Sequence, residues 1–451
     1  MAPVLLKTLL SLVQSLLGAI APILHDDRGV SAAIVAIALP GLIGLGALGV
    51  ETGAWFTTKL RNQSAADAAA ISAAYEVLAG KTNVINDLAP AVGEAAARNG
   101  YSGSIPVIEF PYSDAIVVNG VAVTLQQTQE PMLAAMFLSG VTVANKAVAV
   151  IEVLDNPCIL ALGTANTGVE LAASTSLFMP NCSIVANSVS GTAIELLTSS
   201  SSITAATLVT AGEIAVQGNP IDPAAPPPEF SLGSLAEIGA PTVADPYAGT
   251  LSHSYITAGM PTSLCKPTTS GSVTVYKTGN CKFSGLNIKT GYTVDLAPGT
   301  YWVTGNLVVH SNGRLECSIC DPVKGTGVTI ILTSQTSKIG YVSMSNATFD
   351  LNAPGSGRFA GVVMVQDANG LSYTRSYNTV TGAAGATLNG LVYFPKTSMT
   401  FHGSPSTTGP KCLLLVVSSL NVDASSNLDI GGCASAGLTN LPTVYTVALA
   451  E

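Results

Sequence analysis

The segment Val30–Val50 constrains the fold more than any other feature, because it is apolar and contains no charged residue. As a helix it would be roughly 31 Å long, enough to cross the hydrocarbon core of a bilayer. Gly41, Gly44, Gly46 and Gly49 would let a second helix approach closely. A buried core helix is the alternative. The length and the absence of charge favour a single transmembrane helix over residues 28–52.

Residues 1–27 form a second apolar segment. Its apolar side chains recur at intervals of three and four residues between Leu5 and Ile23, which is typical of an amphipathic helix lying in the cytoplasmic interface of a membrane. Ala19-Ile20-Ala21 also resembles a signal-peptide cleavage site. The sequence leaves both interpretations open.

Basic residues do not decide the orientation of the transmembrane helix. Lys7 and Arg28 precede it, and Lys59 and Arg61 follow it, which is a tie under the positive-inside rule. The cysteines all follow the helix, and an even number on one side indicates disulfides in an oxidising compartment. We therefore expect a cytoplasmic N-terminus and a periplasmic or extracellular body. The disulfide candidates are Cys158, Cys182, Cys265, Cys281, Cys317, Cys320, Cys412 and Cys433.

The pairing of these cysteines is not fixed by the sequence, since eight cysteines allow 105 arrangements. We expect neighbours in the sequence to pair, because each such pair closes a short loop. Buried free thiols are the alternative for several of them.

The composition narrows the range of partners. The net charge is −9 and only 10% of the residues are charged, so no basic stripe exists to neutralise phosphates, and nucleic acid is excluded as a partner. The 44 glycines, together with abundant Ser, Thr, Asn and Val, favour extracytoplasmic β structure over a helix-rich cytosolic enzyme.

An alanine-rich motif follows the apolar segment. After Glu51-Thr52-Gly53 the helix is expected to continue to about residue 79, through Gln63, Ala65, Ala66, Asp67 and Ala68. Asp67 would make a polar contact to a partner helix or would simply be solvated.

Residues 28 to 80 resemble the N-terminus of TadG-like proteins, which belong to the TadE/TadG group of tight-adherence (Flp-type) pilus assembly. The runs 325–332 and 390–395 also resemble TadG-related proteins.

The resemblance implies a single-pass inner-membrane protein with a periplasmic body. Membrane lipid and other pilus-assembly or envelope proteins would be its partners, and the N-terminal helix would support a homo-oligomer. Longer TadG proteins carry a von Willebrand factor A-type domain with an Asp-x-Ser-x-Ser metal site. This chain has no such run, so it resembles a short form, for which we expect neither metal nor cofactor.

The remaining chain is expected to be mainly β. Residues 53–156 read as a periplasmic helix and a small α+β, pilin-like module. Residues 157–218 and 262–451 contain short apolar runs between Ser, Asn, Gly and Thr, which is typical of a β-solenoid. Residues 219–261, with a cluster of prolines, read as a linker or surface excursion with one weak helix.

Candidate catalytic groups are sparse. Cys317-Ser318-Ile319-Cys320 has the spacing of redox pairs but lacks their strand–helix context, which favours a structural disulfide. No histidine pair has the spacing of a metal site. The carboxylates are isolated in sequence: Asp222, Asp245, Asp295, Asp321, Asp350 and Asp367. The aromatic candidates for a glycan groove, which are more simply explained as core, are Tyr301, Trp302, Tyr341, Tyr393 and Phe394.

The sequence thus predicts a non-catalytic, membrane-anchored envelope protein that acts in pilus assembly through protein contacts. A surface adhesin or glycan-binding β-solenoid is the alternative. A polysaccharide-degrading β-helix enzyme is a third hypothesis, which would require stacked carboxylates.

Overall fold

The computed structural model separates the chain into two compact units. They comprise Met1–Glu152 with Val447–Glu451, and Val153–Thr446. The structure describes residues 30–78, 80–114, 117, 120–131, 140–154, 157–334, 338–368, 372–382, 387–402, 412–423, 426–427 and 444–450. The expected interfacial segment 1–27 lies outside the described residues.

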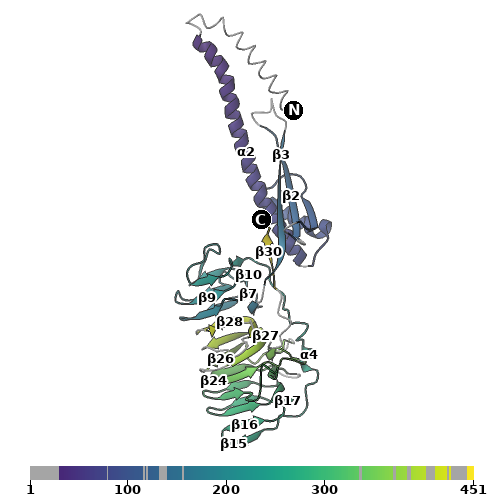
Figure 1. The fold of residues 1–451 in the computed structure, drawn as a ribbon, viewed down its shortest axis with the longest axis vertical. Helices are drawn as coiled ribbons and strands as arrows, with labels where there is room; N and C mark the ends of the chain where they lie inside the picture. The colour runs from purple at the N-terminus through teal and green to yellow at the C-terminus, as the bar shows by residue number, and fades with distance from the viewer. Residues whose placement is uncertain are drawn as a thin grey trace. The chain divides into compact units, whose positions relative to one another are not determined.

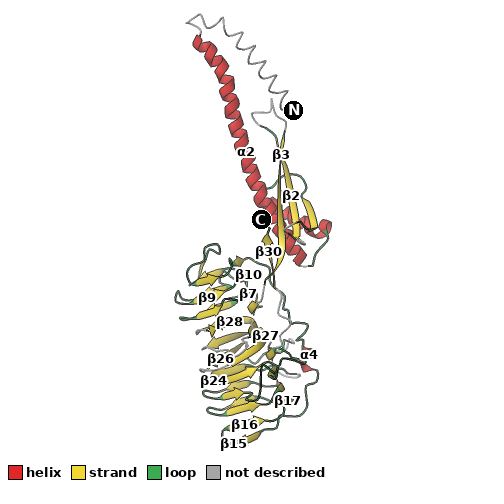
Figure 2. Cartoon of the chain, in the orientation of Figure 1, coloured by secondary structure: helices red, strands yellow, loops and turns green. Residues whose placement is uncertain are grey.

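One continuous helix, α2 (Val30–Leu78), contains both the apolar segment and the alanine-rich motif (Figures 1 and 2). Its 49 residues include the expected transmembrane helix 28–52 from Val30 onward and the expected outward continuation. Gly80 adopts a φ of +81° just beyond its end, a backbone conformation in which glycine is the usual residue after a helix.

The second half of the first unit is a small antiparallel sheet with a short helix. The helix α3 (Ala89–Arg98) has a proline in its first turn, is preceded by η2 (Val84–Leu88), and is followed by Gly100 at a φ of +78°. The sheet has the strand order β1-β2-β3-β30, and β3 pairs with β2 from Val141 to Ala149. These strands are β1 (Val107–Tyr112), β2 (Gly120–Gln129), β3 (Val141–Leu154) and β30 (Val444–Leu449).

The second unit consists of short strands in long parallel ladders. Many strands pair in parallel with the strand three further along the chain, such as β16 with β19, β17 with β20 and β18 with β21. The first ladder runs through β17 (Cys281–Phe283), β20 (Gly299–Val303), β23 (Val328–Leu332), β25 (Val362–Gln366), β27 (Thr387–His402), β28 (Leu413–Val422), β4 (Pro157–Ala161), β7 (Ser183–Ala186), β10 (Leu208–Thr210) and β14 (Glu237–Ile238).

Further ladders share the long strands of the first. The second ladder runs through β18 (Leu286–Ile288), β21 (Leu307–Val309), β24 (Val342–Asn352), β26 (Tyr377–Gly382), β27, β28, β5 (Val169–Leu171), β8 (Ile194–Leu196) and β11 (Ile214–Val216), and then pairs antiparallel with β12 (Asn219–Pro220). The third runs through β16 (Val273–Tyr276), β19 (Thr293–Leu296), β22 (Arg314–Glu316), β24 and β27, and β15 (Thr268–Ser270) pairs antiparallel with β16. A separate parallel sheet holds β29 (Ser426–Asn427), β6 (Ser176–Met179), β9 (Ser202–Ala205) and β13 (Phe230–Leu232).

The order of strands in space differs from their order in the chain. The late strand β28 pairs with the early strands β4 and β5, so the segments 157–238 and 268–422 form one continuous set of ladders. The core lies between the ladders, where alternate residues point inward and stack in register. Leu286, Leu307 and Val342, for example, form one buried column.

The segment 219–261 is not only a linker. Its proline-rich part stays largely on the surface, but β13 and β14 join the parallel sheets. Beyond them, Tyr247, Leu251 and Ile256 are buried in the core of the second unit, and the short helix α4 (His253–Thr257) forms as expected. The expectation of a surface excursion is therefore wrong for this part, because its apolar side chains cover the flank of the first ladder.

Candidate functional site

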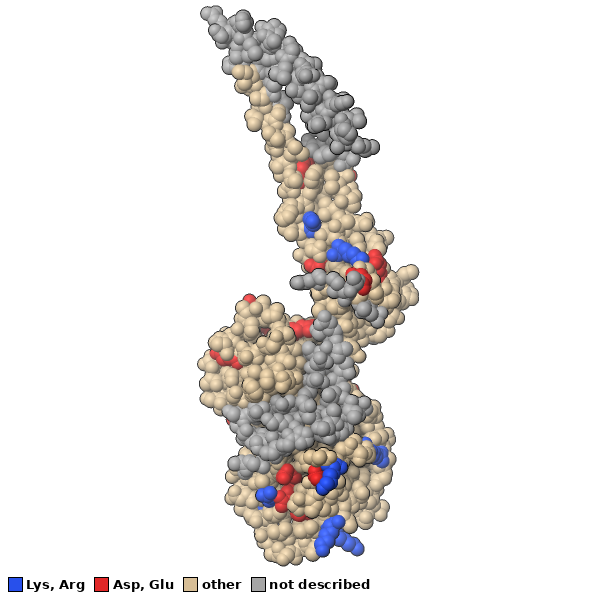
Figure 3. Space-filling model, viewed as in Figure 1, with Lys and Arg blue, Asp and Glu red and all other residues tan. Residues whose placement is uncertain are grey.

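The first half of α2 presents an apolar surface. Leu42, Ile43 and Leu45 are 66%, 63% and 70% exposed, which would be unfavourable for a helix in water. A Cβ atom added at any of the four glycines, Gly41, Gly44, Gly46 or Gly49, would meet no described atom within 4 Å. By length and composition α2 is the one described helix that could cross a membrane. Figure 3 shows its upper part without charged side chains.

The second half of α2 packs on the small sheet through alanines. Its buried face consists of Ala65, Ala66, Ala69, Ala70, Ala73 and Ala74, all of which are 0% exposed. These methyl groups share one hydrophobic core with Val121, Val123 and Leu125 of β2, and with Val92 of α3. Because alanine is the smallest side chain that favours a helix, the run lets the helix backbone lie close to the sheet. The motif therefore has a packing role within the chain.

Polar residues of the same motif bond to the sheet. The Asn145 Nδ2 donates to the Gln63 Oε1 at 2.8 Å, and the Gln63 Nε2 donates to the Asp67 Oδ1 at 2.8 Å. Asp67 is half-buried, and this bond to Gln63 lies within its own helix. Ala68 lies half-buried beside it.

One buried polar residue of α2 was not singled out from the sequence. Asn62 is 0% exposed, yet neither its Nδ2 nor its Oδ1 has a hydrogen-bond partner among the described residues. A buried polar group without a partner costs roughly 1–3 kcal/mol. The sequence signal was weak, since an asparagine in a helix usually reads as solvated. The enclosure of Asn62 is visible only in the folded structure.

The cysteines of the second unit are disulfide-bonded. The structure contains Cys158–Cys182, Cys265–Cys281 and Cys317–Cys320, each of which joins neighbours in the cysteine order. Cys412 is also disulfide-bonded, while Cys433 lies outside the described residues. Disulfide bonding, as expected for an oxidising compartment, is confirmed for these cysteines.

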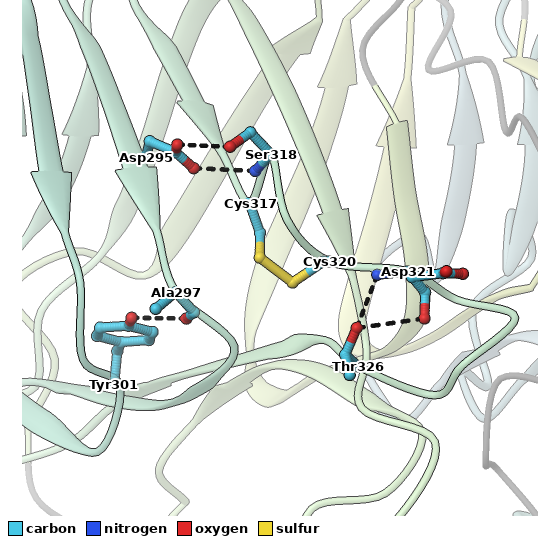
Figure 4. The surroundings of a disulfide bond; sticks show 8 residues. All are labelled: Asp295, Ala297, Tyr301, Cys317, Ser318, Cys320, Asp321 and Thr326. Atoms are coloured by element: carbon cyan, nitrogen blue, oxygen red, sulfur yellow. Dashed lines mark hydrogen bonds between the residues drawn. A yellow bond between two sulfur atoms is a disulfide. The ribbon is translucent and has the colours of Figure 1, made fainter.

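The C-x-x-C pair lies in a tightly bonded turn after β22 (Figure 4). The amide and hydroxyl of Ser318 both donate to the Asp295 carboxylate, at 2.9 and 2.6 Å. The Asp321 amide donates to the Thr326 hydroxyl at 2.8 Å. Because the turn is followed by further turns and not by a helix, the arrangement lacks the environment that activates redox cysteines.

Folding brings together polar groups that are far apart in the sequence. The His253 Nδ1 lies 2.6 Å from the Asp367 Oδ2, which also accepts a hydrogen bond from the Thr333 hydroxyl at 2.6 Å. The Tyr373 hydroxyl donates to the Asp367 backbone carbonyl at 2.8 Å, and burial together with the Asp367 charge raises the pKa of Tyr373 to about 12. This cluster ties α4 to the end of β25. Sequence reasoning missed it because His253 and Asp367 are 114 residues apart.

Two other carboxylates named above also accept hydrogen bonds from side chains. The Tyr393 hydroxyl donates to the Asp245 Oδ2 at 2.7 Å, and the Thr387 hydroxyl donates to the Asp350 Oδ1 at 2.7 Å. No group of three or more His, Cys, Asp or Glu side chains that could hold a metal ion occurs among the residues that the structure describes.

The aromatic residues considered for a glycan groove are mostly core. Tyr301, Trp302, Tyr393 and Phe394 are at most 5% exposed, and Tyr341 is half-buried with the Arg375 guanidinium 4.0 Å from its ring centroid. The packing interpretation of these residues is therefore the one that the structure supports.

Together, these features define a protein with a long N-terminal helix that is exposed and apolar in its first half and packed on a small sheet in its second. Residues 29–76 match the family model described as putative Flp pilus-assembly TadE/G-like. The chain thus carries a TadE/G-like domain that coincides with helix α2. No curated protein and no solved structure matches the chain.

Proposed function

We propose that this chain is a non-catalytic, membrane-anchored envelope protein that takes part in Flp-type pilus assembly through protein–protein contacts. The observation that carries the proposal is the coincidence of the family match at 29–76 with α2, whose first half is apolar and exposed. A helix of this composition is stabilised by lipid and by other helices and not by water.

The disulfides support one orientation of the chain across the membrane. They lie in the second unit, after α2, and persist in the periplasm or outside the cell but not in the cytoplasm. We infer an inner-membrane span with the bulk of the chain periplasmic. The glycines of the span would let a partner helix, from another envelope protein or from a second copy of the chain, approach closely.

We further infer that the parallel ladders of the second unit form a β-solenoid. Pairing between strands three apart, with buried columns such as Leu286-Leu307-Val342, supports this interpretation. In a solenoid each turn is held by its neighbours, which makes the unit a stiff arm with wide lateral faces for protein contacts. The carboxylates engaged in structural hydrogen bonds support a binding role over catalysis.

Site-specific photo-crosslinking tests this proposal. A photoreactive residue at Gly44 or Gly46, in cells that assemble the pilus, is expected to crosslink to a membrane component of the assembly machinery or to a second copy. A probe at Glu213, an exposed position of the second unit, serves as the matched control for non-specific crosslinking. Equal crosslinking at all three positions, or normal piliation in cells that lack residues 30–78, would contradict the proposal.

A further inference from the structure

A groove of 510 Å³ crosses the second unit beside the segment that follows α4. It lies over the turns that precede β20 and β23 and over the turn that follows β24. Since neighbouring parallel strands are about 4.8 Å apart, three successive turns give it a length of roughly 10 Å. The side chains that matter for its chemistry are Asn280, Thr300, Trp302, Thr326, Ser356 and Arg358.

Arg358 brings a positive charge to this groove. Its guanidinium donates to the backbone carbonyls of Ala258 and Tyr255, and stacks 4.4 Å from the ring centroid of Tyr255. A guanidinium has five N–H donors, so donors remain after these two bonds. Arg358 forms no salt bridge with a described carboxylate, and none of the residues that line the groove is acidic. The exposed guanidinium is therefore available to an anionic ligand.

The rest of the lining suits a ligand rich in hydroxyl groups. Asn280 uses its Oδ1 to accept from the Thr300 amide at 3.0 Å, which leaves its Nδ2 as a donor. The hydroxyls of Thr300 and Ser356 bond to no other described residue. Trp302 is fixed by a 2.8 Å hydrogen bond from its Nε1 to the Ile256 carbonyl. Hydroxyl and amide groups that keep free donors and acceptors form hydrogen bonds to the hydroxyls of a sugar.

Glycine lets two neighbouring turns under the groove pack closely. A Cβ atom at Gly327 would lie 2.4 Å from the Ala353 carbonyl, so a side chain does not fit there. Gly327 therefore allows the turn before β23 to lie against the turn after β24, and both turns line the groove.

We propose that this groove binds a short stretch of an acidic polysaccharide, with a uronate carboxylate on Arg358 and the sugar hydroxyls on Asn280, Thr300 and Ser356. A carboxylate bound by guanidinium N–H groups forms a charge-assisted pair that a neutral sugar cannot form. One arginine and several neutral polar groups fit one negative charge among many hydroxyls. An acidic peptide would supply charge without those hydroxyls. The inference does not depend on a role in pilus assembly.

Binding of a galacturonate hexasaccharide to the full-length protein in detergent micelles tests the inference by titration calorimetry. Maltohexaose is the neutral control, and a hexaglutamate peptide is the acidic non-sugar control. The hexasaccharide is expected to bind, and both controls are expected to bind at least about tenfold more weakly. Failure of the hexasaccharide to bind, or equal affinity for either control, would overturn the proposal.

Two variants locate the site. Arg358→Gln removes the charge, and Ser356→Tyr fills the groove at an exposed position while Arg358 stays in place. Both are expected to weaken hexasaccharide binding about tenfold or more. Arg375→Gln is the matched control, because Arg375 also stacks on an aromatic ring, that of Tyr341 at 4.0 Å, but lies away from the groove. Equal losses in Arg358→Gln and Arg375→Gln, or full binding by Ser356→Tyr, would place the ligand elsewhere and refute the assignment.

Discussion

The alanine face of α2 makes a quantitative prediction for Ala70→Leu. Ala70 is 0% exposed and lies in the core between α2 and β2, so leucine would add three carbon atoms where the closely packed sheet leaves no room. Overpacking of this kind costs roughly 1–3 kcal/mol. Ala68→Leu is the control, because the change in helix propensity is the same and Ala68 is half-exposed.

Hydrogen exchange of the full-length protein, followed by mass spectrometry, measures the local effect. Peptides that cover residues 65–74 are expected to exchange about 5- to 150-fold faster in Ala70→Leu, which is the factor that 1–3 kcal/mol of opening free energy gives. Exchange in the second unit is expected to stay unchanged. If Ala70→Leu and Ala68→Leu exchanged at the same rate, close packing would not be the role of these alanines.

Three further predictions concern stability. Asn62→Leu is expected to stabilise the first unit by roughly 1–3 kcal/mol, because it removes a buried polar group without a partner; a loss of stability in denaturant unfolding would show that Asn62 is satisfied. Burial, and after it the negative charge of the neighbouring Glu195, raises the pKa of Glu170. Because the folded state then binds this proton more tightly than the unfolded chain does, stability falls as the pH rises through the raised pKa. Glu170→Gln is expected to reduce the decrease of Tm with rising pH. If Tm depended on pH in the same way in Glu170→Gln and in the exposed control Glu213→Gln, the reasoning would be contradicted. Replacing both cysteines of a disulfide by serine is expected to lower the free energy of unfolding by an amount that grows with the loop that the disulfide closes. The sequence separations of 24, 16 and 3 residues give about 3.5 kcal/mol for Cys158–Cys182, about 3 kcal/mol for Cys265–Cys281 and about 1.6 kcal/mol for Cys317–Cys320. A reversed order of unfolding midpoints would rule out loop closure as the cause.

Local patterns predicted the helices well. The absence of charge in Val30–Val50 and the alanines that follow it indicate one long helix, and α2 is that helix. The end of α3 follows from Asn99-Gly100, since a glycine after a helix adopts positive φ at low cost. In both cases the determining interactions lie within a few residues of one another.

The sequence could not predict contacts that depend on which strands pair. Nothing in the local pattern near β28 indicates that it pairs with β4 and β5, which lie some 250 residues earlier in the chain, because short parallel strands carry similar Leu, Val and Ile patterns. The His253–Asp367 contact and the groove at Arg358 also depend on long-range packing, that of residues 253–259 beside β20 and β25. For the same reason, the sequence did not indicate that residues 236–256 contribute to the core, because they follow a proline-rich run.

The central claim is that the first half of α2 spans the membrane and the disulfide-bonded body lies beyond it. Protease protection in bacterial spheroplasts, combined with alkaline extraction of the membranes, tests this claim most directly. We predict that the protein stays in the membrane fraction at alkaline pH, and that protease added outside the spheroplasts cleaves the second unit. Release of the protein by alkali, or a second unit that resists protease until the membrane is broken, would contradict the account.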